Sequence, residues 1–359
     1  MNSQFSHTFP AARGVQAGRP CYIAMCPMRL IPKIFVFDEE EVPPELRAQR
    51  TLNRARIPEI ASYLIDNNRD YTLSAITASI NAQVRFEPSS DTGIGQNLGS
   101  LSIPMDAQIL INDGQHRRRA IESAIEENPE LGYDNIPVLF FIDEGLERSQ
   151  QMFADLNKHA VRPSDSISTL YDRRDSIAEL ARSMVRDVEA FSRLTELERS
   201  SISNRSSKLF TLSAIKNATK ALLAKGKGDP IDDHEAALAA AYWNTVAENM
   251  PDWQQALTKK IATWELREQY IHSHGVMLQA MGNIGVDLLL RPKSQWSEIL
   301  KGLGKIDWAR ANQNWEGRAM QHGRISKTTH SVMLTGNYIK LQLGLPLSAS
   351  EQEYEDNLK

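Results

Sequence analysis

The stretch that decides the fold is residues 108–127, which read QILINDGQHRRRAIESAIEE. A short run of branched apolar residues ends at Asn112, Asp113 and Gly114, and apolar residues at helical spacing begin directly afterwards. This order predicts a strand, a tight turn and a helix. We expect Asp113 to act as the helix N-cap and Gly114 to let the backbone approach a neighbouring group closely.

The first turn of this helix is the candidate phosphate site. Backbone amides in a first helical turn have no intrahelical acceptor, so they favour an anion, most often a phosphate. Helical spacing aligns His116 and Arg117 with apolar positions further along, so both side chains are expected to point inward. Arg118 and Glu122 are expected on the outer side, where they form an ordinary ion pair.

An inward-pointing arginine needs a negative partner, because burying an unmatched charge is costly. One alternative is a structural carboxylate, Asp113 or Asp143, with His116 as a satisfied core histidine. The other alternative is a bound phosphate held by the helix amides, His116 and Arg117. The pattern of residues alone leaves both open.

Composition places the chain among soluble globular proteins. Its 359 residues are 41% hydrophobic and 24% charged, with a formal net charge of −4, which suits roughly two domains and excludes collagen, disordered tails and membrane bundles. A nucleic-acid contact would need a local basic surface. We expect a cytoplasmic protein without membrane contact, because the start lacks the order of a signal peptide and only Cys21 and Cys26 are present.

The chain divides into two parts that differ in the spacing of their apolar residues. The first part contains short β-rich runs, and from about residue 171 the apolar residues recur at helical spacing. The expected fold class is α+β, with a mixed α/β domain in residues 1–170 and a mostly α-helical domain in residues 171–359. The β-rich runs are residues 21–25, 34–37, 73–80, 108–111 and 137–142.

The sequence resembles a known family at the predicted turn. Residues 113–117 spell DGQHR, the signature of the DGQHR-domain proteins. Further stretches look like the DndB branch of that family, which belongs to DNA sulfur modification, and the resemblance covers nearly the whole length. These stretches are residues 9–35, 46–56, 153–164 and 331–348.

The resemblance implies a cytoplasmic bacterial protein linked to DNA phosphorothioation. Its expected role is a DNA-binding transcriptional regulator of the modification genes, with double-stranded DNA from the promoter of its own operon as partner. The DGQHR domain is similar to the ParB and sulfiredoxin fold, in which such a turn holds nucleotide phosphates. Gly114, His116 and Arg117 match that pattern, and the implied nucleotide is ATP, alone or with Mg²⁺.

An enzyme and an assembly component are the alternative functions. In a weak ATP hydrolase, Arg117 would stabilise developing phosphate charge and His116 would handle a proton. The chain has no Walker A loop, since neither of its Gly-Lys pairs is followed by Ser or Thr. Any nucleotide chemistry would therefore use the turn at residues 113–117. An assembly component would instead dock its helical half on other modification proteins.

Further nucleotide-binding candidates lie outside this turn. Asn157 and Lys158 follow a helical run, although an Asn cap with a solvated cation would look the same. Arg50 and Arg54 belong to a basic stretch whose ordinary interpretation is a solvated helix face. The full expected set is Asp113, Gly114, Gln115, His116, Arg117, Asn157, Lys158, Arg50 and Arg54.

The expected DNA contacts are Cys26, Arg199, Arg205 and Lys208. The last three lie in residues 199–208, RSSISNRSSK, a polar stretch typical of phosphate contacts and equally of an ordinary loop. Arg29 lies close to Cys26 in sequence and could activate its thiol, but a buried inert thiol is the alternative. No helix-turn-helix pattern stands out.

We expect no structural metal and a homo-oligomer. His272 and His274 are two residues apart, so they do not share a helix face, and no acidic pattern accompanies them. All six tryptophans fall in the helical half, where they suit a core or a subunit interface. A two-fold dimer would match a palindromic DNA site.

Overall fold

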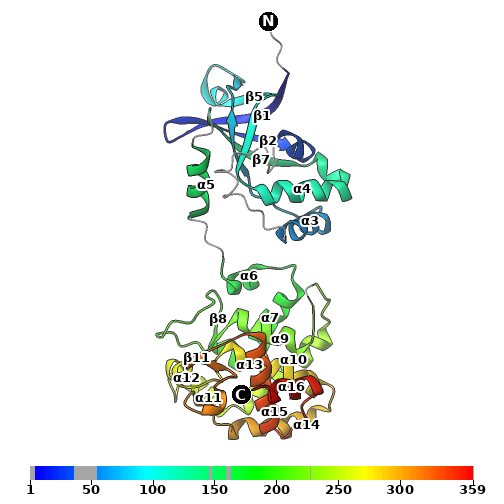
Figure 1. The fold of residues 1–359 in the computed structure, drawn as a ribbon, viewed down its shortest axis with the longest axis vertical. Coiled ribbons are helices and arrows are strands. Elements are labelled where there is room, and N and C mark those ends of the chain that lie inside the picture. The colour runs from blue at the N-terminus through cyan, green and yellow to red at the C-terminus, as the bar shows by residue number, and fades with distance from the viewer. Residues whose placement is uncertain (1–4, 36–54, 145–147, 159–162, 227, 359) are drawn as a thin grey trace. The chain divides into compact units, whose positions relative to one another are not determined.

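The computed structural model divides the chain into two units, Met1–Val161 and Arg162–Lys359. Each unit has its own hydrophobic core, and each is described by itself (Figure 1). The structure describes residues 5–35, 55–144, 148–158, 163–226 and 228–358.

The first unit is built on a mixed seven-stranded sheet with the order β4-β5-β1-β2-β7-β3-β6. Strands β3 and β7 are parallel, and the other neighbouring pairs are antiparallel. The strands are β1 (Ser6–Gln16), β2 (Arg19–Pro27), β3 (Ile76–Asn81), β4 (Arg85–Pro88), β5 (Leu98–Pro104), β6 (Gln108–Asp113) and β7 (Asn135–Ile142).

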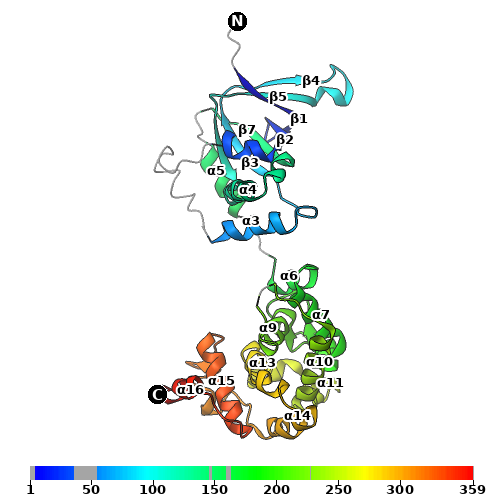
Figure 2. The same ribbon diagram turned by 90° about the vertical axis from the view of Figure 1, so that its right-hand side faces the viewer.

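Helices α3 (Arg56–Asp66) and α4 (Gln115–Glu127) pack side by side in this unit (Figure 2). Alternate side chains of β2 and β7, such as Val138 and Phe140, are buried, and so is Ile121 of α4, whereas consecutive side chains of β3 and β6 are buried. This alternation is what a sheet with one face on the core requires. The other α-helices among the described residues of this unit are α1 (Ile31–Ile34) and α5 (Ser149–Lys158), and α5 contacts β6.

Most of the strand predictions are confirmed, and one is wrong. Runs 21–25, 108–111 and 137–142 lie in β2, β6 and β7, and β3 begins three residues into run 73–80. Ile34 was expected in a strand but ends helix α1. Pro32 lies at the start of that helix, where its fixed φ suits the first turn, and Ile31 and Ile34 bury the same side. Residues 36–37 lie outside the described residues.

The second unit is mostly helical. Two short strand pairs accompany the helices, β8 (Thr195–Glu196) with β9 (Phe210–Thr211), and β10 (Met320–Gln321) with β11 (Arg324–Ile325). The helices are α6 (Asp165–Tyr171), α7 (Ser176–Asp187), α8 (Glu189–Leu194), α9 (Leu212–Leu222), α10 (Asp233–Glu248), α11 (Pro251–Leu257), α12 (Thr263–Gln269), α13 (Gly275–Leu289), α14 (Lys293–Leu300), α15 (Thr329–Gln342) and α16 (Ala349–Asp356).

Helix α13 is the centre of this unit and packs against α9 and α15. Met281 and Ile284 of α13 are buried. Gly282 lets the two backbones come together, since a Cβ there would lie 2.2 Å from the carbonyl oxygen of Ala218 on α9. Five tryptophans fill the core as expected, whereas Trp264 is 48% exposed.

The close approach of α9 and α13 gives a stability prediction. Gly282→Ala should lower the free energy of unfolding by about 1–3 kcal/mol, because the added methyl group overlaps a backbone atom. Gly336→Ala on α15 is the matched control, since its Cβ would lie 3.9 Å from the nearest atoms, both of Ala280. That control should be neutral or stabilising by up to about 1 kcal/mol. Urea denaturation of both variants measures the difference, and equal effects would contradict this packing.

Candidate functional site

The candidate site is the turn that joins β6 to α4. Strand β6 ends at Asp113, and Gly114 follows with a left-handed φ of 113° as the N-cap of α4. No side chain caps this helix and its first turn holds no acidic residue. The expectation that Asp113 is the N-cap was therefore wrong, because Asp113 still pairs with Thr77 as a strand residue.

Gly114 is required by both its conformation and its surroundings. A positive φ of this size is strained for any residue with a Cβ. A Cβ here would also lie 3.0 Å from Cγ1 of Ile76 and 3.1 Å from Nη2 of Arg117. The turn therefore places the Arg117 guanidinium directly over the backbone of Gly114.

Arg117 is matched by Asp113. Its Nη2 lies 2.5 Å from Oδ2 of Asp113, and its Nη1 donates to the hydroxyl of Ser74. The Arg117 side chain is 16% exposed and its Nε has no hydrogen-bond partner. Of the two expected carboxylates, the structure brings Asp113 to Arg117, while Asp143 accepts from the backbone amide of Arg148. The structural ion pair is thus formed.

His116 lies half-buried beside two cations. Burial, followed by the positive charges of Arg56 and Arg117, lowers the pKa of His116, and the charge of Asp113 opposes this shift. The imidazole is therefore neutral near pH 7. The neighbouring cations give this turn the positive potential that an anion would favour.

Asn112 fixes the turn to the core of the first unit. The sequence pattern did not single out this residue for a role. It is fully buried, its Nδ2 donates to the Ser79 hydroxyl at 2.8 Å, and its Oδ1 accepts from the Ser149 hydroxyl at 2.6 Å. These bonds join β3, β6 and α5 at the residue before Asp113. A buried polar residue at the end of an apolar strand was the available signal.

Gln115 of the expected set, and Arg118 in the same helix, lie differently from what the sequence predicts. The Gln115 side chain is buried and donates to the carbonyl of Ile111 at 3.1 Å. Arg118 was expected on the outer side but is 6% exposed. It pairs with Glu122 at 2.6 Å and donates to the carbonyl of Pro32 at 2.7 Å, because the α1 segment covers this part of α4.

The structure describes no side chain of the other nucleotide-binding candidates. Asn157 and Lys158 are the last residues of α5, and their side chains lie outside what the structure describes. Arg50 and Arg54 also lie outside the described residues. Arg56, a described residue of the same basic stretch, contributes a charge that acts on His116.

The residues predicted to contact DNA differ in how far they are buried. Cys26 is fully buried in the first core, and burial raises the pKa of its thiol to about 12, so its predicted DNA contact is corrected to an inert core thiol. Arg199 and Arg205 are exposed between β8 and β9. The ammonium of Lys208 donates to the carbonyl of Arg193 at 2.8 Å.

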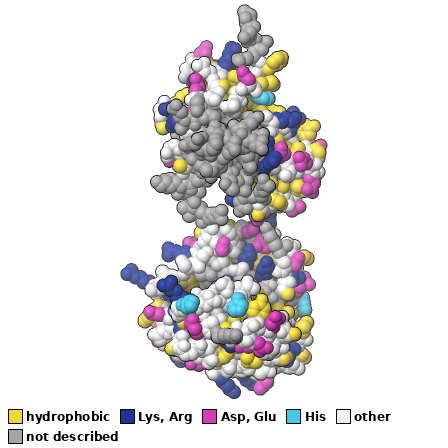
Figure 3. Space-filling model, in the orientation of Figure 1, with side chains coloured by type: hydrophobic (Ala, Val, Ile, Leu, Met, Phe, Trp, Pro, Cys, Tyr) yellow, Lys and Arg dark blue, Asp and Glu magenta, His cyan; other side chains and the backbone are white. Residues whose placement is uncertain are grey.

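The surface shows no single basic side in the view of Figure 3. Lys and Arg side chains of the second unit are interspersed there with Asp and Glu. Within the described residues, no three His, Cys, Asp or Glu side chains gather as a metal site would require. None of the described helices is long and apolar enough to cross a membrane.

The comparisons with known proteins decide the family. A family model described as "DndB: DNA-sulfur modification-associated" matches residues 9–346, a range that includes most of both units. The chain belongs to the DndB family. The resemblance found at the DGQHR turn is therefore confirmed at family level, and membership in the DndB family associates the chain with DNA sulfur modification. No curated protein and no solved structure matches it.

The turn gives a second stability prediction. Gly114→Ala should lower the free energy of unfolding by about 1–3 kcal/mol through backbone strain and through contact with Ile76 and Arg117. Gly18→Ala is the control, because Gly18 also has a positive φ, of 73°, but nothing lies within 4 Å of its Cβ position. Thermal unfolding of both variants should show the larger loss for Gly114→Ala. A loss no greater than that of Gly18→Ala would contradict the crowded turn.

Proposed function

We propose that this DndB-family protein is a DNA-binding transcriptional regulator of the DNA sulfur modification genes, with a nucleotide site at the start of α4. The observation that carries the proposal is the family match over residues 9–346, which ties nearly the whole chain to DNA sulfur modification. In this proposal the first unit is a domain of the ParB and sulfiredoxin kind, and ATP is the nucleotide that modulates DNA binding.

The geometry of the α4 turn supports a phosphate ligand. The amides of Gln115, His116 and Arg117 begin a 13-residue helix that no side chain caps. Such amides and the helix dipole favour a negative charge. Arg56 adds positive charge near His116. Mg²⁺, where it takes part, would be carried on the phosphates of ATP.

Asp113 would compete with the phosphate for Arg117. Its side chain is 46% exposed, so it can turn to solvent when a phosphate takes its place beside the guanidinium. Arg117 then has two states, one paired with Asp113 and one bound to the phosphate. A ligand that binds the DNA-free and DNA-bound forms differently must change DNA affinity by the same factor.

Removing the competing carboxylate should therefore strengthen nucleotide binding. Asp113→Asn should tighten ATP binding by about 3- to 10-fold, or about 0.7–1.4 kcal/mol. Arg117→Ala should weaken it by about 10-fold or more, because charge-assisted hydrogen bonds are lost. Isothermal titration calorimetry measures both changes. If Asp113→Asn destabilises the protein and leaves ATP affinity unchanged, the pair is structural only.

A mobility-shift titration tests the regulator. The labelled duplex is the region upstream of the modification genes, unrelated duplex serves as competitor, and salt is held fixed because DNA affinity depends steeply on it. We expect a competitor-resistant shift that ATP changes and that becomes insensitive to ATP in Arg117→Ala. Arg119→Ala is the matched control, since Arg119 is exposed on the same helix and pairs with Glu122 alone among the described residues.

The same titration separates the alternatives. A two-fold dimer would give a symmetric footprint on a palindromic site. If the protein shows no preference for the upstream duplex, the regulator proposal is overturned. The ATP hydrolase and the assembly component then remain. A neutral His116 could accept a proton, which favours the hydrolase. Phosphate release by the wild type and by His116→Gln would then decide between these two.

A further inference from the structure

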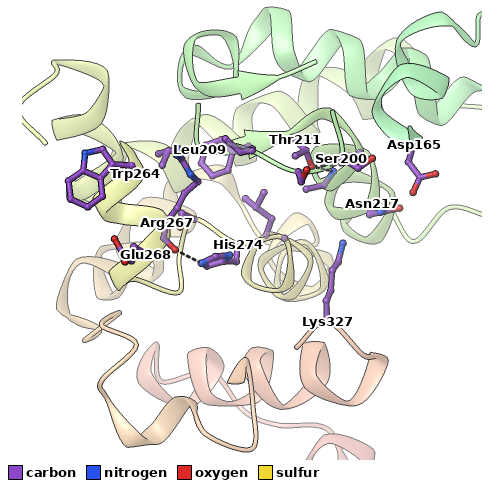
Figure 4. Close-up of a pocket in the computed structure, with 18 of the residues that line it drawn as sticks. Asp165, Ser200, Leu209, Thr211, Asn217, Trp264, Arg267, Glu268, His274 and Lys327 are labelled. Atoms are coloured by element: carbon purple, nitrogen blue, oxygen red, sulfur yellow. Dashed lines mark hydrogen bonds between the residues drawn. The ribbon is translucent and has the colours of Figure 1, made fainter. Parts of the chain in front are cut away.

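The second unit contains a cavity of about 610 Å³ at the start of α13 (Figure 4). This volume lies within the range of small-molecule sites. Its wall includes residues of the 199–208 stretch, which the sequence marked as a phosphate-contact candidate, together with parts of α9, α12 and α13. The wall also includes Arg267, His274, Arg310, Lys327 and Trp264.

Three cations line this cavity without a carboxylate partner in the described part of the chain. The Arg267 guanidinium donates only to backbone carbonyls, among them those of Ser203 at 2.9 Å and Lys208. Arg310 donates to the carbonyl of Glu268 at 3.0 Å. Lys327 is exposed and forms no hydrogen bond or ion pair with any described residue.

Lys340 and Arg318, which are buried or partly buried elsewhere in this unit, are matched by carboxylates. Lys340 pairs with Asp287 and Glu351, and Arg318 pairs with Glu355. Clustered cations repel one another, and desolvation adds to the cost. An anion in the cavity would remove this cost.

The ammonium of Lys327 lies at the positive end of a helix. A Cβ on Gly275, the first residue of α13, would be 3.4 Å from Nζ of Lys327. Helix α13 has 15 residues, no side-chain cap and no acidic residue in its first turn. A cation and a helix N-terminus disfavour each other, whereas both favour a phosphate between them. Desolvation lowers the pKa of Lys327.

His274 lines the cavity and adds no positive charge to it. Burial lowers its pKa to about 4, so the imidazole is neutral at pH 7. Its Nε2 donates to the carbonyl of Arg267 at 2.9 Å, the dashed line in Figure 4. The carboxylates of Asp165 and Glu268 also line the cavity, but neither forms an ion pair with its cations.

Trp264 supplies a flat aromatic surface at the other side of the cavity. It is the most exposed tryptophan of the described unit, and Figure 4 shows it on the side opposite Lys327. Exposed indoles stack on nucleotide bases, and Asn204 and Asn217 in the wall offer amide groups for hydrogen bonds.

We propose that this cavity binds a mononucleotide. Its phosphate lies between Lys327 and the first turn of α13, with Arg310 nearby, and its base lies toward Trp264. This site is separate from the turn at α4 and does not depend on the proposed function.

Titration of the full-length protein with AMP tests this site. Lys327→Ala should weaken AMP binding by at least about 10-fold. Gly275→Asp should do the same, because it places a carboxylate where the phosphate would lie. An acidic residue in a first helical turn stabilises a helix, so Gly275→Asp should keep or raise Tm, which separates lost binding from lost folding. Lys305→Ala, an exposed lysine outside the cavity, should leave AMP affinity unchanged.

Arg117→Ala separates the two proposed sites. AMP binding that survives Arg117→Ala and is lost in Lys327→Ala supports the cavity. AMP binding that is lost in Arg117→Ala and insensitive to Lys327→Ala overturns the cavity and leaves the α4 site in place. A short 5′-phosphorylated single strand and inorganic phosphate are titrated in parallel. Binding of the strand without AMP, or of inorganic phosphate as tightly as AMP, would contradict a mononucleotide site.

Discussion

The left-handed backbone of Gly114 is the constraint on which the first unit depends. It turns the chain from β6 into α4 without a longer loop, so that Gly114 alone lies between the strand and the helix. Because the turn is so short, Arg117 reaches back to Asp113 across the backbone of Gly114. Asn112 fixes the same point to β3 and α5 from inside the core. A residue with a Cβ at position 114 would disturb the strand end, the helix start and the guanidinium together.

Charge matching distinguishes structural cations from candidate binding groups. Buried cations such as Lys340 have carboxylate partners and need no ligand. Arg117 has one carboxylate partner among the described residues, and solvent reaches that carboxylate, so a phosphate can exchange with it. Lys327 has none among the described residues. Both candidate sites combine an uncapped helix start with nearby cations, which are Arg117 of the same helix and Arg56 of α3 at one site, and Lys327 and Arg310 at the other. Helix dipoles and fixed charges arranged in this way favour phosphates.

Local features of the fold could be predicted from the sequence, whereas features made by distant segments could not. The strand, turn and helix at residues 108–127 follow from a change in apolar periodicity at one glycine. The inward direction of Arg117 follows from helical spacing, which left Asp113, Asp143 and a phosphate open as its partner, and the structure brings Asp113 to it. Arg118 was misplaced because its cover comes from Pro32, far away in the sequence. Lys327 and Arg310 gave no signal, because only the packing of α12, α13 and the segment before α15 brings them to one cavity.

The most direct test of the phosphate site at α4 is amide nuclear magnetic resonance of the ¹⁵N-labelled protein during titration with ATP. The account predicts that the amides of Gln115, His116 and Arg117 shift most within the first unit, and that Arg117→Ala abolishes these shifts. ATP that binds the protein while these three amides stay unchanged would contradict it.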